Sequence, residues 1–265
     1  MMRLLTCLLG IILLQACSVS TSTMKKSNNN YNPVIAHRGA FKKNGFPENS
    51  IASLREAIRL GCAGAEFDVR MTADDSLVIN HDPHFVKLDI EKHTYAELAV
   101  NSLSNGEQFP TLRNYLISGL KDNKHTKLIL EIKPSPAGTS RGELIATKVL
   151  QLVKDCGAAS MTEYISFDLA ILKQLLKLDN TLITHYLNGE LSPYALKSLG
   201  IRGMDYNYSV YQKNPDWITE AKNAGVILNV WTVNEAAKLD WCLQQQFNFI
   251  TTNEPELLFE KLTKN

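Results

Sequence analysis

The chain has few cysteines, almost no excess charge and no hydrophobic run long enough to cross a bilayer. Its 265 residues carry a formal net charge of +1, from 28 basic and 27 acidic residues. There is no overall basic field to hold a nucleic acid, so we expect no nucleic-acid partner. No internal repeat or heptad pattern is visible. With 45% hydrophobic residues the chain is long enough for one sizeable core, and a single α/β barrel fits this length.

The cysteines support neither a zinc site nor a disulfide framework. Of the five, Cys7 and Cys17 lie at the N-terminus, which leaves Cys62, Cys156 and Cys242. Their spacing matches no metal motif. At most one internal disulfide can form among these three, and the sequence does not say between which pair. We favour the alternative that they are buried as small hydrophobic residues.

The N-terminal segment has the composition of a targeting signal. An apolar run from Leu4 to Ala16 is too short to span a bilayer and is typical of secretion. It ends in "LQAC", which resembles a bacterial lipobox, although Gln15 is unusual there. We predict a signal peptide at residues 1–16, a lipidated Cys17 with a flexible tether over 17–32, and one domain over 33–265. Secretion without a lipid anchor is the alternative.

From residue 33 onward, short apolar runs alternate with helical patterns. Eight runs predict strands, near 34–37, 65–71, 128–132, 164–167, 182–186, 203–206, 226–231 and 249–251. Eight further segments predict helices, near 50–60, 111–120, 143–155, 169–178, 193–199, 215–224, 235–245 and 256–261. This alternation predicts a TIM (β/α)8 barrel. A doubly wound open sheet alternates in the same way, and periodicity alone does not separate the two.

One further strand candidate, Leu77 to Asp82, breaks the alternation. Only "TADDS" separates it from the second predicted strand, whereas a parallel crossover needs a dozen or more residues. The segment should therefore fold back as an antiparallel hairpin. If the turn centres near Asp74, residues 66–68 lie across from residues 80–82. His81 is then expected beside two acidic side chains, Glu66 and Asp68.

Charged residues gather at the ends of predicted strands. Glu66 and Asp68 stand two apart in "AEFDV", and Glu131 and Lys133 stand two apart in "LILEIKP". Residues two apart on a strand point to one side, which in a barrel is mainly apolar. Buried like charges are costly, and a divalent cation such as Ca²⁺ or Mg²⁺ is their natural partner. We favour a site at the barrel mouth over a set of buried ion pairs.

A nucleophile-elbow pattern offers a competing enzyme class. "GTSRG" at residues 138–142 contains Ser140, and Asp168 and His185 follow in the chain order of a hydrolase triad. The elbow needs a sharp turn from strand to helix, but "PSPA" intervenes here. We therefore interpret the segment as a flexible loop over the barrel mouth, and His185 as a satisfied core histidine.

Several motifs, taken in order, resemble the glycerophosphodiester phosphodiesterase family. They are "AHRGAFKKNGFPENS", "GAEFDVRMTADDSLVINHDP", "LILEIKP" and "VWTVN", and the resemblance runs from Val34 to about Leu258. It implies a TIM barrel and one bound divalent cation, Ca²⁺ or Mg²⁺. It also implies hydrolysis of a glycerophosphodiester to sn-glycerol 3-phosphate and an alcohol. The short segment between "HDP" and Pro110 argues against a large inserted domain.

The resemblance also implies roles for individual residues. The matched acid/base pair is His37 and His81, and the matched metal ligands are Glu66, Asp68 and Glu131. The positive groups near the phosphate are Arg38 and Lys133, with Trp231 lining the substrate pocket and Glu48 orienting Arg38 or the metal site. Which histidine is the acid is left open. Asn253 stands where the family often has Asp, and we expect it to cap the last helix.

The sequence thus predicts a metal-dependent glycerophosphodiester phosphodiesterase of a bacterial cell envelope. Its lipid anchor would hold it to a membrane, on the periplasmic or outer-surface side, and no obligate protein partner is inferred. One alternative is a related barrel phosphodiesterase acting on lysophospholipid or sphingolipid headgroups. Another is a lipoprotein that binds phosphodiesters without turnover, although every catalytic-type position is filled. The alcohol, the choice between the two ions, the membrane and the oligomeric state are left open.

Overall fold

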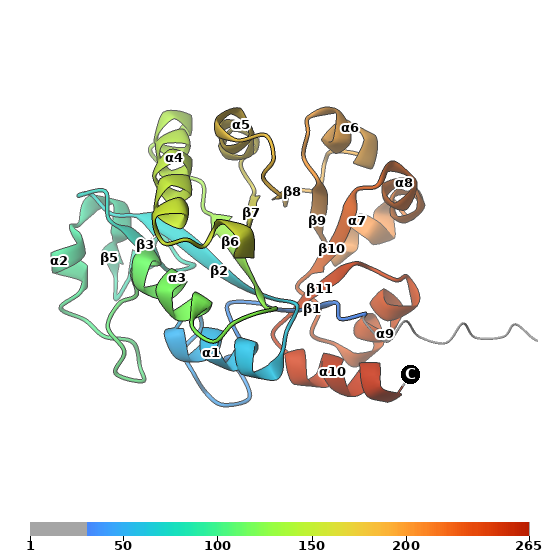
Figure 1. Ribbon diagram of the computed structural model, residues 1–265, viewed down its shortest axis with the longest axis horizontal. Coiled ribbons are helices and arrows are strands. Elements are labelled where there is room, and N and C mark those ends of the chain that lie inside the picture. The colour runs from blue at the N-terminus through green and yellow to red at the C-terminus, as the bar shows by residue number, and fades with distance from the viewer. Residues whose placement is uncertain (1–30, 265) are drawn as a thin grey trace, which may run out of the picture. The chain divides into compact units, whose positions relative to one another are not determined.

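Eight parallel strands close into a barrel in the computed structural model, which describes residues 31–264 (Figure 1). They are β1 (Val34–Ala36), β2 (Gly64–Met71), β6 (Lys127–Ile132), β7 (Thr162–Ser166), β8 (Thr184–Tyr186), β9 (Gly203–Asn207), β10 (Ile227–Trp231) and β11 (Phe249–Thr252). Strand β1 pairs with both β11 and β2, and this pairing closes the sheet. Closure excludes the open sheet, so the predicted TIM barrel is confirmed.

Helices surround the barrel and bury their apolar faces against it (Figure 1). The predicted ones are α1 (Ile51–Leu60), α3 (Leu112–Leu120), α4 (Thr139–Asp155), α5 (Leu169–Leu178), α6 (Pro193–Ser198), α8 (Asp216–Ala224), α9 (Ala236–Gln244) and α10 (Pro255–Lys264). The sequence did not predict two short helices, α2 (Tyr95–Leu98) and α7 (Tyr208–Lys213), or the 3₁₀ turns Ile90–Lys92 and Ala159–Met161. Elements of one or two turns leave too few residues for a periodic signal.

Helix α4 begins at Thr139, so the interpretation of residues 138–142 as a flexible loop was wrong. Gly138 precedes the helix with φ of 96°, and Ser140 lies in its first turn. The turn is held from outside the helix: the Arg141 guanidinium donates to the carbonyl oxygen of Thr72 at 2.7 Å and pairs with Glu91 at 3.3 Å. These partners are distant in sequence, and no local pattern reveals them.

The extra strand β3 (Leu77–Ile79) runs antiparallel to the end of β2. Val69 pairs with Ile79 and Met71 with Leu77, a register that centres the turn on Asp74 as predicted. A short insertion follows, with a two-stranded ribbon of β4 (His84–Phe85) and β5 (Leu88–Asp89). It has a small core of its own, formed by Val78, Phe85, Ile90, Leu98 and Phe109. The hairpin brings the segment that follows β3, including His81, to the mouth of the barrel.

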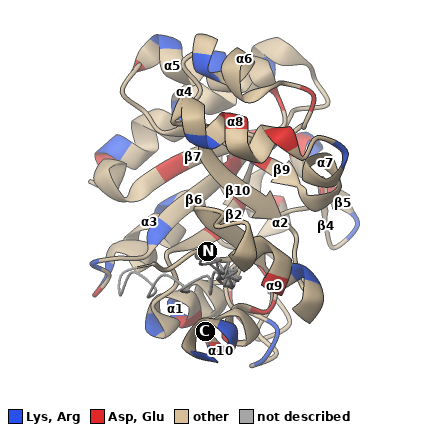
Figure 2. Ribbon diagram, turned by 90° about the vertical axis from the view of Figure 1, so that its right-hand side faces the viewer, with Lys and Arg blue, Asp and Glu red and all other residues tan. Residues whose placement is uncertain are grey.

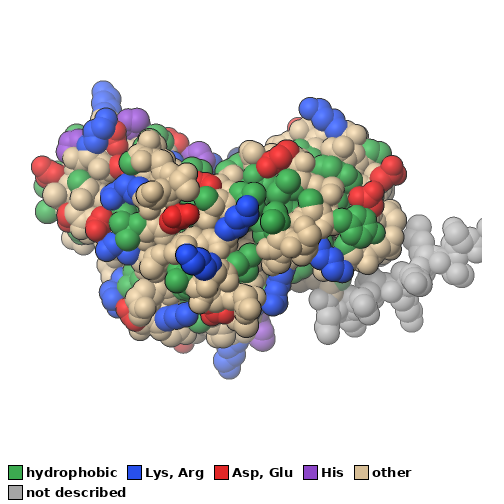
Figure 3. Space-filling view, turned by 90° about the horizontal axis from the view of Figure 1, so that it is seen from above, with side chains coloured by type: hydrophobic (Ala, Val, Ile, Leu, Met, Phe, Trp, Pro, Cys, Tyr) green, Lys and Arg blue, Asp and Glu red, His purple; other side chains and the backbone are tan. Residues whose placement is uncertain are grey.

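Inside the barrel, an apolar cluster lies beside the charged residues described below. It is formed by Ile35, Ile129, Ile165 and Leu187, and the last two also line the pocket at the strand ends. On the outside, acidic and basic segments are interspersed along the ribbon (Figure 2). The face seen in Figure 3 likewise carries both signs of charge, with hydrophobic side chains between them.

The remaining N-terminal predictions lie beyond the described residues. The predicted signal peptide, Cys17 and nearly all of the tether fall within residues 1–30. Among the described residues, no helix has both the length and the apolar composition needed to cross a bilayer. Cys62 and Cys242 are buried thiols, and Cys156 is a partly buried one.

Candidate active site

A pocket of about 110 Å³ opens at the C-terminal ends of the barrel strands. Seven of the predicted site residues line it: His37, Arg38, Glu66, His81, Glu131, Lys133 and Trp231. Asp68 belongs to the same cluster and is almost fully buried. Glu48 lies on the loop before α1 and reaches Arg38. The structure therefore brings together every sequence-predicted site residue of the barrel domain.

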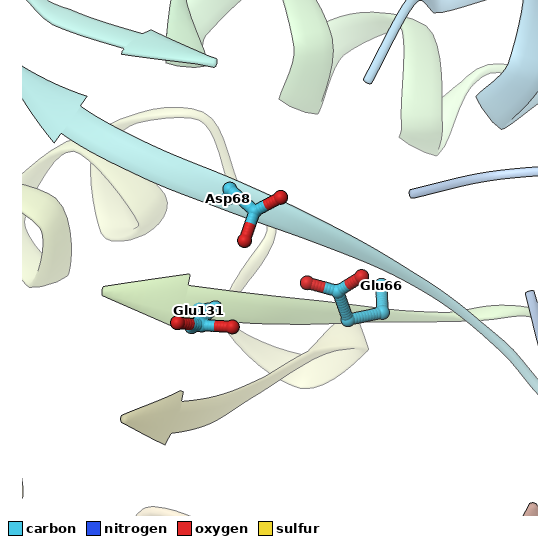
Figure 4. A group of neighbouring side chains, drawn as sticks. All are labelled: Glu66, Asp68 and Glu131. Atoms are coloured by element: carbon cyan, nitrogen blue, oxygen red, sulfur yellow. The ribbon is translucent and has the colours of Figure 1, made fainter. Parts of the chain in front are cut away.

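Three buried carboxylates face one another at one side of this pocket (Figure 4). Glu66 and Asp68 come from β2 and Glu131 from β6, and one oxygen of each lies within 4.8 Å of the others. Asp68 and Glu131 are direct partners in the register of these strands. The period-two spacing in the sequence thus places the two acids of β2 on the inward face, next to that of β6.

The cluster carries more negative charge than its neighbours offset. Lys133 Nζ lies 2.7 Å from both Asp68 Oδ1 and Glu131 Oε1, one ammonium for three carboxylates. Burial, and then the charges of Asp68 and Glu131, raise the pKa of Glu66 well above its usual range. Burial also opposes ionisation of Asp68, but Lys133 outweighs it and lowers the pKa of that carboxyl. Only part of the cluster is therefore electrostatically satisfied.

These donors fit a hard divalent cation. Glu66 Oε1 is buried and has no hydrogen-bond partner among the described residues. Burial, and then the charge of Asp68, raise the pKa of Glu131 as well, although Lys133 lies 2.7 Å away, so this one ammonium does not offset the buried negative charge. Carboxylate oxygens converging from two strands are ligands that Ca²⁺ and Mg²⁺ take. Glu66, Asp68 and Glu131 are thus the residues that would hold such an ion.

Arg38 is held in an uncommon backbone conformation at the end of β1. Its φ is 55°, and its backbone N–H donates to Glu66 Oε2 at 2.9 Å. Its guanidinium Nη1 donates to both carboxylate oxygens of Glu48, at 2.8 and 2.9 Å, and its Nε lies 3.7 Å from Asp68 Oδ2. Non-glycine residues rarely adopt positive φ, and the surrounding contacts must hold them there. In this conformation the guanidinium lies between Glu48 and the Asp68 carboxylate of the cluster.

Gly39, which follows Arg38, allows α1 to approach the site closely. Its φ is 80°, and a Cβ atom at this position would collide with Ser53 of α1. Asn49, just before this helix, donates to Asp68 Oδ2 at 2.8 Å and accepts from its backbone N–H at 3.2 Å. The neighbouring Ser50 caps α1 by accepting from the backbone N–H of Ser53. The "PEN" turn therefore supplies a contact to the carboxylate cluster that sequence reasoning missed.

His37 is oriented by a residue from the far end of the chain. Its Nδ1 lies 2.7 Å from Asn253 Oδ1, and because a carbonyl oxygen can only accept, Nδ1 carries the proton. Nε2 is then free to accept a proton, 3.9 Å from Glu66 Oε2. Burial, and next the charge of Arg38, lower the pKa of His37 to about 4. The imidazole is therefore neutral near pH 7.

The prediction that Asn253 caps the last helix was wrong. Helix α10 begins at Pro255, and the Asn253 side chain turns to His37 instead. Its position directly after β11, at the mouth of the barrel, is the one sequence signal that could have indicated this role.

His81 approaches the same pocket from the β3 hairpin. Its Nδ1 lies 2.8 Å from Asp82 Oδ1, and its backbone carbonyl accepts from Arg70 Nε at 3.0 Å and Nη2 at 2.7 Å. Asn80, one residue earlier, donates its backbone N–H to the carbonyl oxygen of Asp68 at 3.0 Å. This ladder contact places His81 at the carboxylate cluster, as the hairpin prediction required.

The esterase triad does not assemble. His185 is buried, and its Nε2 lies 3.1 Å from Glu163 Oε2, so it is a core histidine. Its Nδ1 has no hydrogen-bond partner among the described residues, so the prediction that it is satisfied holds for one ring nitrogen and not for the other. The Asp168 carboxylate caps α5 by accepting from the backbone N–H of Ala170. Ser140 lies exposed in the first turn of α4. Both partners of a Ser140 nucleophile are therefore engaged elsewhere.

The family model of the glycerophosphoryl diester phosphodiesterase family matches residues 37–257. The chain belongs to this family. It is similar to a glycerophosphodiester phosphodiesterase of Caldanaerobacter subterraneus subsp. tengcongensis, 29% identical over 247 residues that make up 87% of this chain and 98% of that protein. The predicted family and enzyme class, a phosphoric diester hydrolase, are confirmed.

Solved structures in this family share the barrel. A glycerophosphodiester phosphodiesterase from Parabacteroides distasonis is 41% identical, with a TM-score of 0.85 over 88% of this chain and 98% of that one. A phosphodiesterase from Oleispira antarctica, solved with its product sn-glycerol-3-phosphate, is 22% identical, with a TM-score of 0.77 over 88% of this chain and 97% of that one. At this lower identity the likeness concerns the fold.

Proposed function

We propose that this chain hydrolyses glycerophosphodiesters to sn-glycerol 3-phosphate and an alcohol, with one bound divalent cation, Ca²⁺ or Mg²⁺. The observation that carries the proposal is a single pocket in which two imidazoles, a guanidinium and an ammonium lie beside three buried carboxylates. Hydrolysis of a phosphodiester needs charge neutralised on the non-bridging oxygens, a base for the nucleophile and an acid for the leaving alkoxide. The pocket contains a group for each task.

The positive groups of the pocket bind the phosphate and neutralise its charge. Glu66, Asp68 and Glu131 would hold the cation, which when bound would supply Lewis-acid stabilisation of charge on the phosphate oxygens. Arg38 and Lys133 line the same pocket and offer hydrogen-bond donors to those oxygens. Glu48 binds the Arg38 guanidinium through both of its oxygens and so fixes its direction. Trp231 forms part of the apolar wall against which the rest of the substrate lies.

The two histidines divide the proton transfers between them. His37 is neutral near pH 7, with its proton on Nδ1, so its Nε2 is suited to take a proton from the attacking hydroxyl or water. His81 lies on the hairpin side of the pocket and then donates a proton to the leaving alkoxide. If the substrate's own glycerol hydroxyl attacks first, it displaces the alcohol and forms a cyclic phosphate that water then opens, and the first step gains the advantage of an intramolecular reaction.

The test is release of sn-glycerol 3-phosphate from glycerophosphocholine by the purified chain, with Ca²⁺, with Mg²⁺ and with chelator. We expect release that chelator abolishes and that His37→Ala lowers by several orders of magnitude. The matched control, His125→Ala, removes an exposed histidine outside the pocket and should leave the rate unchanged. No release from any glycerophosphodiester with either ion would overturn the proposal. Release that survives chelation and is lost in Ser140→Ala would indicate a serine esterase.

We also propose that the chain is lipid-anchored at Cys17 in a bacterial cell envelope. The support is the sequence itself: an apolar run that ends in "LQAC", followed by a polar segment without apolar periodicity. After expression in a bacterium and partition in a cloud-point detergent, we expect the full-length chain in the detergent phase. Cys17→Ala should move to the aqueous phase. Wild-type chain that stays aqueous would contradict the anchor.

A further inference from the structure

One buried carboxylate in the pocket lies outside the cation cluster. Asp205, in the middle of β9, is 1% exposed and lines the same pocket as His37 and Lys133. Among the described residues, no lysine, arginine or histidine forms an ion pair with it. Its Oδ1 is buried without any hydrogen-bond partner there. An unsatisfied buried carboxylate oxygen is costly, so its retention calls for a ligand group.

Asp205 lies across the barrel from the proposed cation site. Going around the closed sheet, β9 is the fourth strand from β2 in either direction, through β6, β7 and β8 or through β1, β11 and β10. A phosphate held by Lys133 and Arg38 therefore leaves the opposite side of the pocket to another part of the substrate.

The surroundings of Asp205 indicate what kind of chemical group this part of the substrate is. Ile165, Leu187 and Phe167 give the same pocket apolar lining, and Phe167 packs edge-to-face on Trp231 with ring centroids 5.5 Å apart. The Trp231 indole N–H donates to the backbone carbonyl of Asp205 at 2.7 Å, so it does not satisfy the carboxylate. An apolar wall beside one free acceptor suits a short carbon chain with a hydroxyl donor. The glycerol part of the proposed substrate has this character.

We propose that Asp205 binds a hydroxyl group of the glycerol moiety and so selects glycerol phosphate over other phosphate esters. This rests on the proposed function, and it adds a specificity-determining residue on β9. The hydroxyl O–H donates to the Asp205 carboxylate, while the phosphate end stays at Arg38 and Lys133. A site that must hydrogen-bond a substrate hydroxyl discriminates strongly against an analogue that lacks it.

Binding of two ligands to the full-length chain tests the proposal without turnover. The first is sn-glycerol 3-phosphate, and the second is propyl phosphate, which keeps the three-carbon chain but has no hydroxyl. With saturating Ca²⁺, calorimetry on Asp205→Leu should show sn-glycerol 3-phosphate bound about 10-fold or more weakly than by wild type. Propyl phosphate should change by less than about 2-fold, and Asp205→Asn, which keeps an acceptor, should fall between the two proteins.

Each other outcome decides the question. Equal weakening of both ligands, with thermal unfolding unchanged, would mean that Asp205 only shapes the pocket, and unchanged binding of both would mean that it has no ligand role. Phosphocholine weakened in place of sn-glycerol 3-phosphate would assign Asp205 to the cationic alcohol. Each of these three results leaves the proposed function standing if wild type releases sn-glycerol 3-phosphate from glycerophosphocholine. Absence of that release would overturn the proposed function and this proposal with it.

Discussion

A single amide orients the imidazole on which the proposed chemistry depends. Asn253 accepts from His37 Nδ1 at 2.7 Å, although the two residues are 216 positions apart in the chain. The contact leaves Nε2 as the proton acceptor, and an uncharged partner does not favour the imidazolium form as a carboxylate would. Asn253 is therefore a positioning residue for His37.

Replacing Asn253 should change both the rate and its pH dependence. We expect Asn253→Ala to lower kcat for glycerophosphocholine by about 10- to 100-fold, because the imidazole loses its fixed direction. Asn253→Asp should retain more activity, but its carboxylate raises the pKa of His37, so the acidic limb of the kcat/KM profile moves to higher pH. The control Asn223→Ala changes an exposed residue of α8. Wild-type kcat in Asn253→Ala would contradict the positioning role.

Asp205 should weaken the fold as the pH rises. Burial raises its folded pKa from 3.8 to about 7. Between these values only the folded state keeps the proton, so stability falls as the pH rises through this window, and above about 7 the loss is complete. The Asp205→Asn variant has no titrating carboxyl at this position, so it does not lose this stability as the pH rises. Its gain in unfolding free energy over wild type should be larger at pH 8 than at pH 5 by on the order of 2 kcal/mol.

Urea unfolding at these two pH values, with chelator present, measures this difference. Asp122→Asn, at an exposed loop position, is the matched control and should give the same small change at both. A gain for Asp205→Asn that is equal at pH 5 and pH 8 would show that the carboxylate does not titrate in this range. A more stable variant that binds sn-glycerol 3-phosphate poorly would mean that stability is sacrificed for recognition.

At the scale of elements, the hairpin and helix α1 deliver the charged groups to the pocket. Because side chains alternate along a strand, a slip of one residue between β2 and β3 would turn His81 away from the carboxylates. Helix α1 follows the loop that carries Arg38 and Glu48. Its N-terminus is capped from the insertion, where the Glu107 carboxylate accepts from the backbone N–H groups of Ile51 at 2.8 Å and Ala52 at 3.1 Å.

Removing this cap should loosen α1 against the barrel. Glu107→Ala leaves two helix N–H groups without their acceptor and removes a negative charge from the positive end of the helix dipole, so we expect a loss of about 1–2 kcal/mol in unfolding free energy. Glu107→Gln keeps one of the two acceptor oxygens but loses the charge, so its loss should fall between those of wild type and Glu107→Ala. Urea unfolding measures both, with the exposed Glu260→Ala as control. A loss no greater than that of Glu260→Ala would show that the cap contributes little.

At the scale of the whole molecule, closure of the barrel gathers like charges that no cation in the described chain fully offsets. Strand β2 contributes two carboxylates and β6 a third, all buried. A cation that binds only the folded state stabilises it by mass action, by about 2.7 kcal/mol at a concentration 100 times its Kd. The metal-free protein should in turn be destabilised by its own site.

A substitution within the cluster separates these two effects. We expect Glu66→Gln to be more stable than wild type in chelator by about 1 kcal/mol, since the variant avoids the cost of burying or protonating this carboxyl beside Asp68 and Glu131. We expect it to lose most of the rise in Tm that Ca²⁺ or Mg²⁺ produces in wild type. Thermal unfolding with each ion measures this, and Glu260→Gln should respond as wild type does. An undiminished rise in Glu66→Gln would place the ion elsewhere.

Much of the barrel follows from local sequence pattern. All eight barrel strands were predicted to within two residues at each end, because each is a short apolar run bounded by polar or turn residues. The predicted turn at Asp74 was right because five residues leave a hairpin as the one available connection. The two-residue spacing of Glu66 with Asp68, and of Glu131 with Lys133, predicted shared faces because alternation along a strand is a local property.

Other features were decided only by tertiary structure. The start of α4 depends on Arg141 reaching Thr72, and the direction of His37 depends on Asn253, partners that the chain brings together only when the barrel closes. In the sequence, Asp205 is a single acidic residue within a predicted strand. Its proposed role in binding glycerol becomes visible only because closure of the barrel places β9 opposite β2. The sequence alone determined which side chains share a face, since that follows from backbone periodicity. Only the closed barrel decided which faces meet, because contacts across it join residues that no local spacing relates.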